Sequence, residues 1–126
     1  MGRTAGELTD EERRAYRRGL LRLSASKQAD AKRRAGEALA VAQQCAAILR
    51  REFGVRRVWL FGSLARGTFG PGSDVDLAVD AIDEGVFLRA LGRLLSLRPD
   101  LPVDLVDLRH ARAGLRAAVE KEGIPL

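Results

Sequence analysis

The chain has 126 residues and a formal net charge of +5, and its length predicts one domain with a core of its own. Its composition is 46% hydrophobic and 31% charged, and no apolar run reaches the ~20 residues of a bilayer-spanning helix. The charged N-terminus does not resemble a secretory signal, and a single cysteine, Cys45, excludes an internal disulfide and a cysteine zinc site. We therefore expect a cytoplasmic protein with no membrane partner.

The positive charge is concentrated in the first half of the chain. Residues 1–57 carry 14 Lys and Arg against 7 Asp and Glu, whereas residues 58–126 carry 8 against 10. A basic helical surface can bind nucleic acid, but with few aromatic residues it is more often solvated or turned toward an acidic partner. The sequence therefore does not favour nucleic acid as the partner.

The first fifty residues predict two helices. Thr9 and Glu12 have the spacing of a capping box, which starts a helix that runs to about Leu23. A second helix is expected from Ser24 or Ser26 to about Phe53, because apolar residues recur there at helical spacing and a glycine follows.

From residue 55 onward, short β-type runs alternate with helical ones, which is typical of α/β and α+β folds. The expected strands cover residues 55–61, 74–80 and 102–108. The expected helices cover residues 83–97 and 109–122. We therefore divide the chain into a basic helical extension, residues 1–52, and a second domain, residues 53–126.

A glycine-rich turn follows the first expected strand. Gly62 and Ser63 stand where the strand ends and a short helix could begin, and free backbone amides at such a point bind phosphate oxygens. Gly62 allows a close approach of the backbone, and Ser63 adds a hydroxyl donor. Arg66 is a further candidate phosphate contact, and Ser73, at the end of the turn, completes the nucleotide-binding candidates.

Three aspartates on two expected strands are candidate metal ligands. Asp74 and Asp76 point to the same side of their strand, roughly 7 Å apart, and Asp104 faces that side if the next strand is a neighbour. Converging carboxylates repel one another unless a cation holds them, and Mg²⁺ prefers oxygen ligands that it shares with phosphates and water. Asp107 lies close to Asp104 in sequence, and either residue is also compatible with a surface charge.

Five further residues are not expected to belong to the site. We expect Cys45 to be a small buried residue, Trp59 and Phe61 to belong to the core, and Asp80 to be a surface charge. The only histidine, His110, is expected to be exposed in the first turn of the last helix.

The pattern of Gly62-Ser63, ten residues and then Asp74-x-Asp76, followed by Asp104 on a hydrophobic strand, resembles the polymerase-β-type nucleotidyltransferase superfamily. Within this superfamily, the chain is similar to the minimal nucleotidyltransferase (MNT) proteins over about residues 53–126. The resemblance implies an α/β (α+β) fold, in which a small mixed sheet is flanked by helices, here with an N-terminal helical extension.

The resemblance also implies an activity. It is the transfer of a nucleoside monophosphate, AMP from ATP, to a hydroxyl acceptor with release of pyrophosphate. Gly62 and Ser63 would hold the triphosphate, and Asp74, Asp76 and Asp104 would bind two Mg²⁺ ions, with Asp104 helping to take the proton of the attacking hydroxyl.

MNT proteins are often encoded beside a HEPN-domain partner and act as its antitoxin, some by attaching AMP to a tyrosine of that partner. The HEPN ribonuclease motif, an Arg four to six residues before a His, is absent ahead of His110, so such a partner would be a separate chain. Three alternatives stay open: a non-catalytic antitoxin or regulatory binding module of the same fold, an aminoglycoside-type nucleotidyltransferase, and, for the N-terminal helices, a homo-oligomer.

Overall fold

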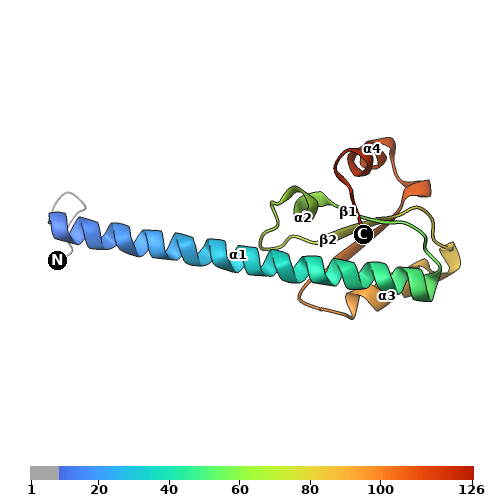
Figure 1. The fold of residues 1–126 in the computed structure, drawn as a ribbon, viewed down its shortest axis with the longest axis horizontal. Coiled ribbons are helices and arrows are strands. Elements are labelled where there is room, and N and C mark those ends of the chain that lie inside the picture. Colours follow the sequence, from blue (N-terminus) through green and yellow to red (C-terminus); the bar gives the residue numbers. More distant parts are fainter. Residues whose placement is uncertain (1–8) are drawn as a thin grey trace. The chain divides into compact units, whose positions relative to one another are not determined.

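The computed structural model describes residues 9–126 (Figure 1). The chain divides into two compact units, the first ending at Arg33 and the second comprising residues 34–126. The helices and strands are α1 Asp10–Phe53, β1 Val58–Phe61, α2 Gly62–Arg66, β2 Val75–Val79, η2 Glu84–Val86, α3 Phe87–Leu95, β3 Val103–Asp107, η3 Leu108–His110, α4 Ala113–Glu122 and β4 Ile124–Pro125.

The first helix is continuous, which differs from the two helices expected. The cap is confirmed, because Thr9 Oγ1 accepts a hydrogen bond from the Glu12 backbone N–H at 3.1 Å. The break expected at Ser24 to Ser26 is wrong: serine does not interrupt the helical hydrogen bonds, and the flanking Leu, Ala, Lys, Gln and Arg residues are strong helix formers. The helix ends at Phe53 as expected, before Gly54 with a φ of 68°.

Four strands form one mixed sheet in the order β3-β2-β1-β4. Strand β1 pairs antiparallel with both β2 and β4, and β2 pairs parallel with β3 through the connection that contains α3. The three expected strands are confirmed with shorter bounds. The two-residue β4 was not expected, since a segment that short, with a proline in it, shows no alternation of apolar and polar residues.

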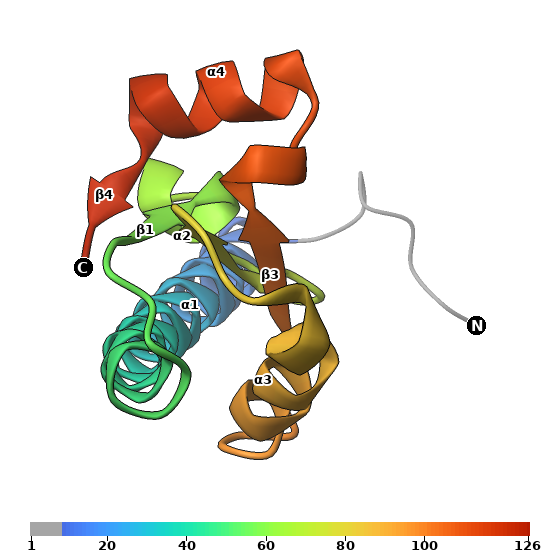
Figure 2. The same cartoon turned by 90° about the vertical axis from the view of Figure 1, so that its right-hand side faces the viewer.

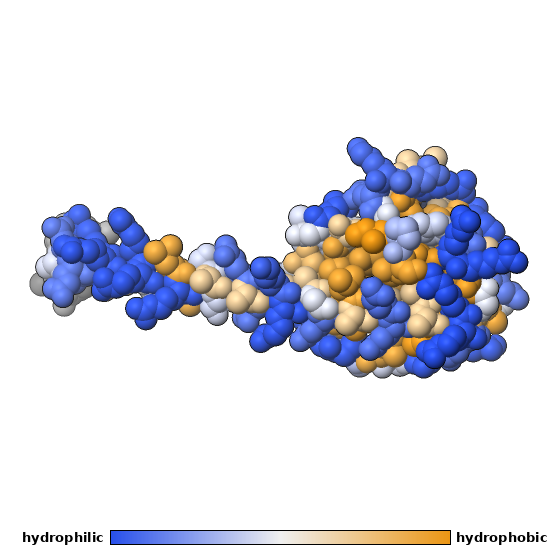
Figure 3. Space-filling view, viewed as in Figure 1, coloured by the Kyte–Doolittle hydropathy of each residue, from blue (hydrophilic) through white to orange (hydrophobic). Residues whose placement is uncertain are grey.

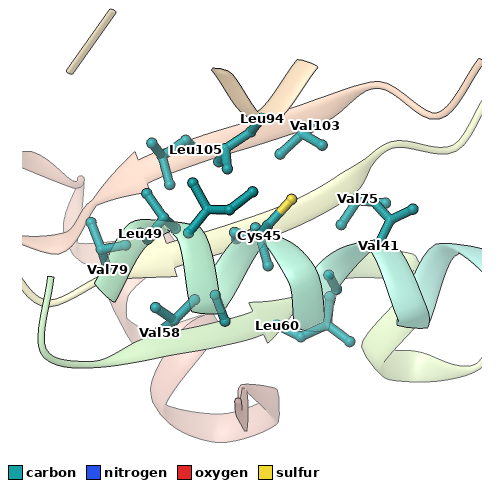
Figure 4. Close-up of a cluster of buried hydrophobic side chains, with 14 of the residues drawn as sticks. Val41, Cys45, Leu49, Val58, Leu60, Val75, Val79, Leu94, Val103 and Leu105 are labelled. Atoms are coloured by element: carbon teal, nitrogen blue, oxygen red, sulfur yellow. The ribbon is translucent and has the colours of Figure 1, made fainter. Parts of the chain in front are cut away.

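The main core lies between the sheet and two helices, α3 and the part of α1 that belongs to the second unit (Figures 2 and 4). Val75, Leu77 and Val79 of β2 are fully buried on this face, which confirms the expected alternation. Cys45 of α1 is also fully buried, as expected. From α1, the buried residues are Ala38, Val41, Ala42, Cys45, Ala46, Ile48 and Leu49.

Helix α4 covers the opposite face of the sheet (Figure 2). Phe61, Ala78 and Val119 are buried there, and Trp59 is partly buried against them. Both aromatic residues of β1 therefore belong to the packed interior, as expected. Among residues 9–126, no helix is both long and apolar enough to span a bilayer.

Each of the two later helices is preceded by a short 3₁₀ turn that an aspartate caps. Asp83 accepts a hydrogen bond from the Gly85 N–H at 2.8 Å, and Asp107 accepts one from the Arg109 N–H at 2.9 Å. The helices expected to start at Asp83 and Arg109 therefore start at Phe87 and Ala113. The reason is that these side chains favour a capped turn over a longer helix.

Asp107 is the one buried charged residue of the described chain. It accepts hydrogen bonds from the Ile82 N–H at 3.3 Å and from Arg109 Nη2 at 2.8 Å. Burial works against the ionised form, but the hydrogen bonds from Arg109 and Ile82 outweigh it and hold the pKa of Asp107 below its usual value. This ion pair ties β3 to the segment that follows β2.

We predict that Arg109→Ala lowers the free energy of unfolding at pH 7, because it leaves a buried carboxylate short of donors. The native state contributes this stability only while Asp107 is ionised. The difference from wild type should therefore shrink as the pH falls below 4. Urea unfolding followed by circular dichroism measures both effects. The exposed neighbour Arg112→Ala is the control, and an equal cost at Arg112 would contradict the prediction.

Candidate active site

The turn between β1 and α2 has a backbone that only glycine fits. Gly62 has a φ of 76°, in the left-handed region that residues with a Cβ rarely adopt. A Cβ at this position would lie 2.1 Å from Asp76 Oδ2. The close approach expected at Gly62 is therefore made by a carboxylate from the neighbouring strand β2. The position of the Asp76 carboxylate therefore excludes any side chain at position 62.

Helix α2 begins at the end of β1, where the sequence predicted it. Its N-cap residue, Phe61, supplies no side-chain hydrogen bond, so no side chain at the cap occupies the first amides of the helix. Ser63 is half-buried in this first turn, and its carbonyl accepts a hydrogen bond from the Thr68 N–H at 2.9 Å. The helix closes at Gly67 in a left-handed cap. The start of such a helix can present backbone N–H donors to an anion.

The candidate aspartates lie on adjacent strands. Phe61 of β1 is in register with Asp76 of β2, and Asp76 is in register with Asp104 of β3. Residues in register share a face of the sheet, so Asp76 and Asp104 point to the same side, as expected. Asp74 precedes Asp76 by two residues and directly precedes β2. The structure thus places Asp76 against the glycine turn, with Asp104 and Asp74 near enough to act on its charge.

The electrostatics of this cluster centre on Asp76. Burial, and then the negative charges of Asp104 and Asp74, together raise its pKa to about 6, while the Arg66 guanidinium works in the opposite direction. Asp76 is half-buried, whereas Asp74 and Asp104 are exposed. The Arg66 guanidinium offsets only part of this cost, so the ionised form of Asp76 is unfavourable in this position.

The residues present fit a magnesium ion that completes its shell from a substrate. Carboxylate oxygens are the ligands that Mg²⁺ prefers. Among residues 9–126, no three His, Cys, Asp or Glu side chains are gathered closely enough to hold a metal by themselves. Mg²⁺ commonly takes one or two protein carboxylates and fills its other positions with phosphate oxygens and water. The arrangement therefore suits an ion that binds together with a phosphate-bearing ligand.

The other two nucleotide-binding candidates flank the cluster. Arg66 is half-exposed, and its Nη1 lies 3.5 Å from Glu122 Oε2 at the end of α4. The Ser73 hydroxyl accepts a hydrogen bond from the Gly70 N–H at 3.1 Å, so it shapes the turn that leads into β2. Glu122 was not expected from the sequence. It is one of several charged residues of α4, and only the packing of α4 beside α2 distinguishes it.

Three other residues singled out in the sequence lie elsewhere. Asp107 has the opposite orientation to Asp104 on β3 and is paired with Arg109, so Asp104 is the aspartate on the face of Asp76. Asp80 is not simply a surface charge: its Oδ1 accepts a hydrogen bond from the Arg57 N–H at 3.1 Å. His110 is exposed as expected, in η3, and its Nε2 lies 3.0 Å from Glu84 Oε1.

Comparisons with known proteins identify relatives of this chain. Two curated relatives are each described as "Protein adenylyltransferase MntA". The relative from Shewanella oneidensis is 40% identical over 68 residues, which are 52% of this chain and 49% of the relative. The relative from Thermococcus cleftensis is 37% identical over 76 residues, which are 59% of this chain and 77% of the relative. The match thus spans about half the length of the Shewanella protein.

The fold is also similar to that of a solved complex, described as a tri-AMPylated Shewanella oneidensis HEPN toxin with MNT antitoxin. A chain of that complex aligns with a TM-score of 0.54 and 28% identity, over 70% of both chains. The sequence profile described as "Polymerase beta, Nucleotidyltransferase" matches residues 43–126, which is most of the chain and includes all the candidate residues. The chain therefore belongs to the polymerase beta nucleotidyltransferase family.

Proposed function

We propose that this chain is a magnesium-dependent nucleotidyltransferase that transfers AMP from ATP to a hydroxyl of a HEPN-type protein toxin and so acts as its antitoxin. The observation that carries the proposal is the alignment of Asp76 and Asp104 beside the glycine turn at Gly62. Family membership supports the reaction class. The names of the MntA relatives support a protein acceptor, and the AMPylated Shewanella toxin supports a HEPN partner.

The triphosphate would bind at the start of α2. The backbone amides of Gly62 and Ser63 and the Ser63 hydroxyl would donate to its oxygens, and Arg66 would neutralise part of its charge. The ion pair with Glu122 orients the Arg66 side chain at the end of α2. Ser73 is proposed to act in the same pocket by keeping the 70–73 turn in shape, and its hydroxyl is also a possible donor.

Asp74, Asp76 and Asp104 would hold Mg²⁺, proposed as two ions, which supplies charge neutralisation at the α-phosphate and lowers the pKa of the attacking hydroxyl. The acceptor oxygen forms a bond to the α-phosphorus while the bond to the pyrophosphate oxygen breaks, and the hydroxyl proton passes to the Asp104 carboxylate. Asp104 suits this role because it is exposed on the outermost strand, β3. A hydroxyl on a large partner can therefore reach it.

Two further assignments accompany the proposal. All candidate site residues lie within residues 53–126, which we assign as the nucleotidyltransferase domain, with residues 1–52 as the basic helical extension. We also place the protein in the cytoplasm, because that compartment supplies ATP and Mg²⁺ and keeps thiols such as Cys45 reduced.

The direct test is transfer of α-³²P-labelled AMP from ATP to the product of the neighbouring gene, in the presence of Mg²⁺. We predict that Asp74→Asn, Asp76→Asn and Asp104→Asn each reduce the rate by at least about 100-fold, because each removes a carboxylate that would hold the Mg²⁺ by which the negative charge of the transition state is neutralised. The exposed Glu120→Gln on α4 is the control. If the variant that combines Asp74→Asn with Asp76→Asn still transfers AMP, the metal assignment is contradicted. If the wild-type protein labels no partner protein, a non-catalytic antitoxin is favoured.

The raised pKa of Asp76 predicts how the stability of the metal-free protein, measured in EDTA, depends on pH. The native state holds the proton of Asp76 more tightly than the unfolded chain does, so ionisation between about pH 4 and pH 7 destabilises the native state. We predict that Asp76→Asn raises Tm by a few degrees at pH 8 and that the gain disappears below pH 4. Added Mg²⁺ and a non-hydrolysable ATP analogue should raise the Tm of wild type and not that of the variant. A Tm for Asp76→Asn below that of wild type at pH 8 would contradict this account.

The clash at position 62 predicts the effect of adding a single methyl group. Gly62→Ala should lower Tm and abolish AMP transfer, because the methyl group strains the left-handed backbone and displaces the Asp76 carboxylate. Gly92→Ala is the matched control, since a Cβ there meets nothing within 4 Å. We expect that control to keep its activity and to gain about 0.5–1 kcal/mol of stability. Equal behaviour of the two variants in thermal melts would show that position 62 is not constrained.

A further inference from the structure

The first half of α1 exposes large apolar side chains on a basic helix. No residue from Thr9 to Arg33 is buried, and this segment lies ahead of the family match that begins at residue 43. Its exposed apolar side chains are Tyr16 (67%), Leu20 (50%), Leu21 (64%) and Leu23 (62%). Figure 3 shows hydrophobic side chains among hydrophilic ones along this part of the helix. A solvated helix with no partner gains nothing from such residues.

Three of these residues fall on one stripe. Positions 13, 16, 20, 23, 27 and 30 are separated by alternating steps of three and four residues, which is the spacing of the contact positions in a two-stranded coiled coil. Tyr16, Leu20 and Leu23 occupy the centre of the stripe. Arg13 lies before them, and Lys27 and Asp30 follow, completing the ends of the stripe. Leu21 lies off the stripe.

The charges at the ends of this stripe discriminate between two orientations of a second copy. A parallel pair would place Arg13 beside Arg13 and Asp30 beside Asp30, which is repulsive. An antiparallel pair in which Leu20 of one copy meets Leu23 of the other places Arg13 beside Asp30. The same register places Lys27 over the ring of Tyr16, a cation–π contact. Self-pairing is therefore favourable in one orientation only.

The remaining charges agree with that register. In it, every basic residue from 13 to 33 lies level with a neutral or acidic residue of the other copy. The pairs are Arg13 with Asp30, Arg14 with Ala29, Arg17 with Ser26, Arg18 with Ala25, Arg22 with Leu21, Lys27 with Tyr16, Lys32 with Glu11 and Arg33 with Asp10. A helix that carries so many arginines would repel its own copy in most registers, and this one avoids the repulsion.

We propose that residues 10–33 are a self-association surface, on which two copies of this chain pair as antiparallel helices centred on Leu20 and Leu23. The inference is independent of the transferase activity, because none of these residues belongs to the site. The interface of this pair buries only two Leu–Leu contacts and two Tyr–Lys contacts, with an Arg–Asp contact at each end. The pairing is therefore reversible and weakened by salt.

The first test is the mass of the full-length protein by sedimentation equilibrium over a range of concentrations. Wild type should show a monomer–dimer equilibrium, and Leu20→Glu combined with Leu23→Glu should weaken dimerisation by more than ~100-fold. Each single variant, Leu20→Glu or Leu23→Glu, should also weaken the dimer, and its matched control is Leu21→Glu, which adds the same single charge at a similarly exposed leucine off the stripe. Circular dichroism verifies that each variant remains helical.

The second test fixes the orientation by disulfide formation. A mixture of Tyr16→Cys and Lys27→Cys proteins should form a cross-linked heterodimer on mild oxidation, whereas Tyr16→Cys alone should not, because its two copies lie eleven residues apart along the helix. The native Cys45 does not compete: it is fully buried, and burial raises the pKa of its thiol to about 11. Charge exchange gives a further check, since Arg13→Asp should weaken the dimer and Asp30→Arg, added to it, should restore it.

Several outcomes would overturn the proposal. They are a monomer at every concentration, a dimer that Leu21→Glu disrupts as strongly as the stripe variants do, and a Tyr16→Cys protein that cross-links to itself. If the leucine variants leave the mass unchanged and instead abolish binding to an acidic helical protein or to RNA, the surface serves that partner and the self-association is wrong.

Discussion

The Asp76 carboxylate lies against the backbone of Gly62, and the geometry of the candidate site depends on this contact. The contact joins the start of α2 to the beginning of β2, so the amides proposed to bind phosphate and the central carboxylate occupy a fixed position relative to each other. Burial and two neighbouring aspartates make the ionised form of Asp76 costly. The fold therefore retains an unfavourable charge that a cation and a nucleotide would relieve, which is the compromise expected where binding takes precedence over stability.

The sheet supports this contact from both sides. Val75, Leu77 and Val79 are fully buried against α1 and α3, and they fix the register of β2 so that Asp76 faces the other way. At the far end of β3, Asp107 is paired with Arg109. Asp104 is the aspartate of β3 that lies in register with Asp76. A slip of one residue in either strand would bury an aspartate and dismantle the site. The alternation of apolar residues in the strands therefore also determines the face on which the carboxylates lie.

The sequence was sufficient for the features that depend on local pattern. The alternation in residues 74–80 predicted which side of β2 is buried, and the glycine turn predicted where α2 begins. The sequence predicted that Asp104 faces the side of Asp76 only if the two strands are neighbours, and the parallel pairing of β2 with β3 meets that condition. The continuity of α1 could not be predicted, because Ser24 and Ser26 suit a cap as well as a helix interior, and only the surrounding backbone decides between the two.

Long-range contacts account for the rest of what the sequence did not reveal. The pairing of Arg66 with Glu122 joins residues 56 positions apart and depends on how α4 packs beside α2. Asp107 looked equivalent to Asp104 because both belong to one acidic strand, and its structural role follows from a hydrogen bond with Ile82, 25 positions away. No local pattern encodes either contact.

Asp104 lies on an edge strand of the sheet, so its surroundings can change independently of those of Asp76. Asp76 lies on an interior strand, where the packed core determines its surroundings, whereas Asp104 borders open solvent at the margin of the sheet. In the proposed reaction, substitutions around Asp104 would therefore alter which hydroxyl is presented to the nucleotide without disturbing the packing beneath Asp76. The choice of acceptor would then depend on one margin of the sheet, and the nucleotide chemistry on its interior.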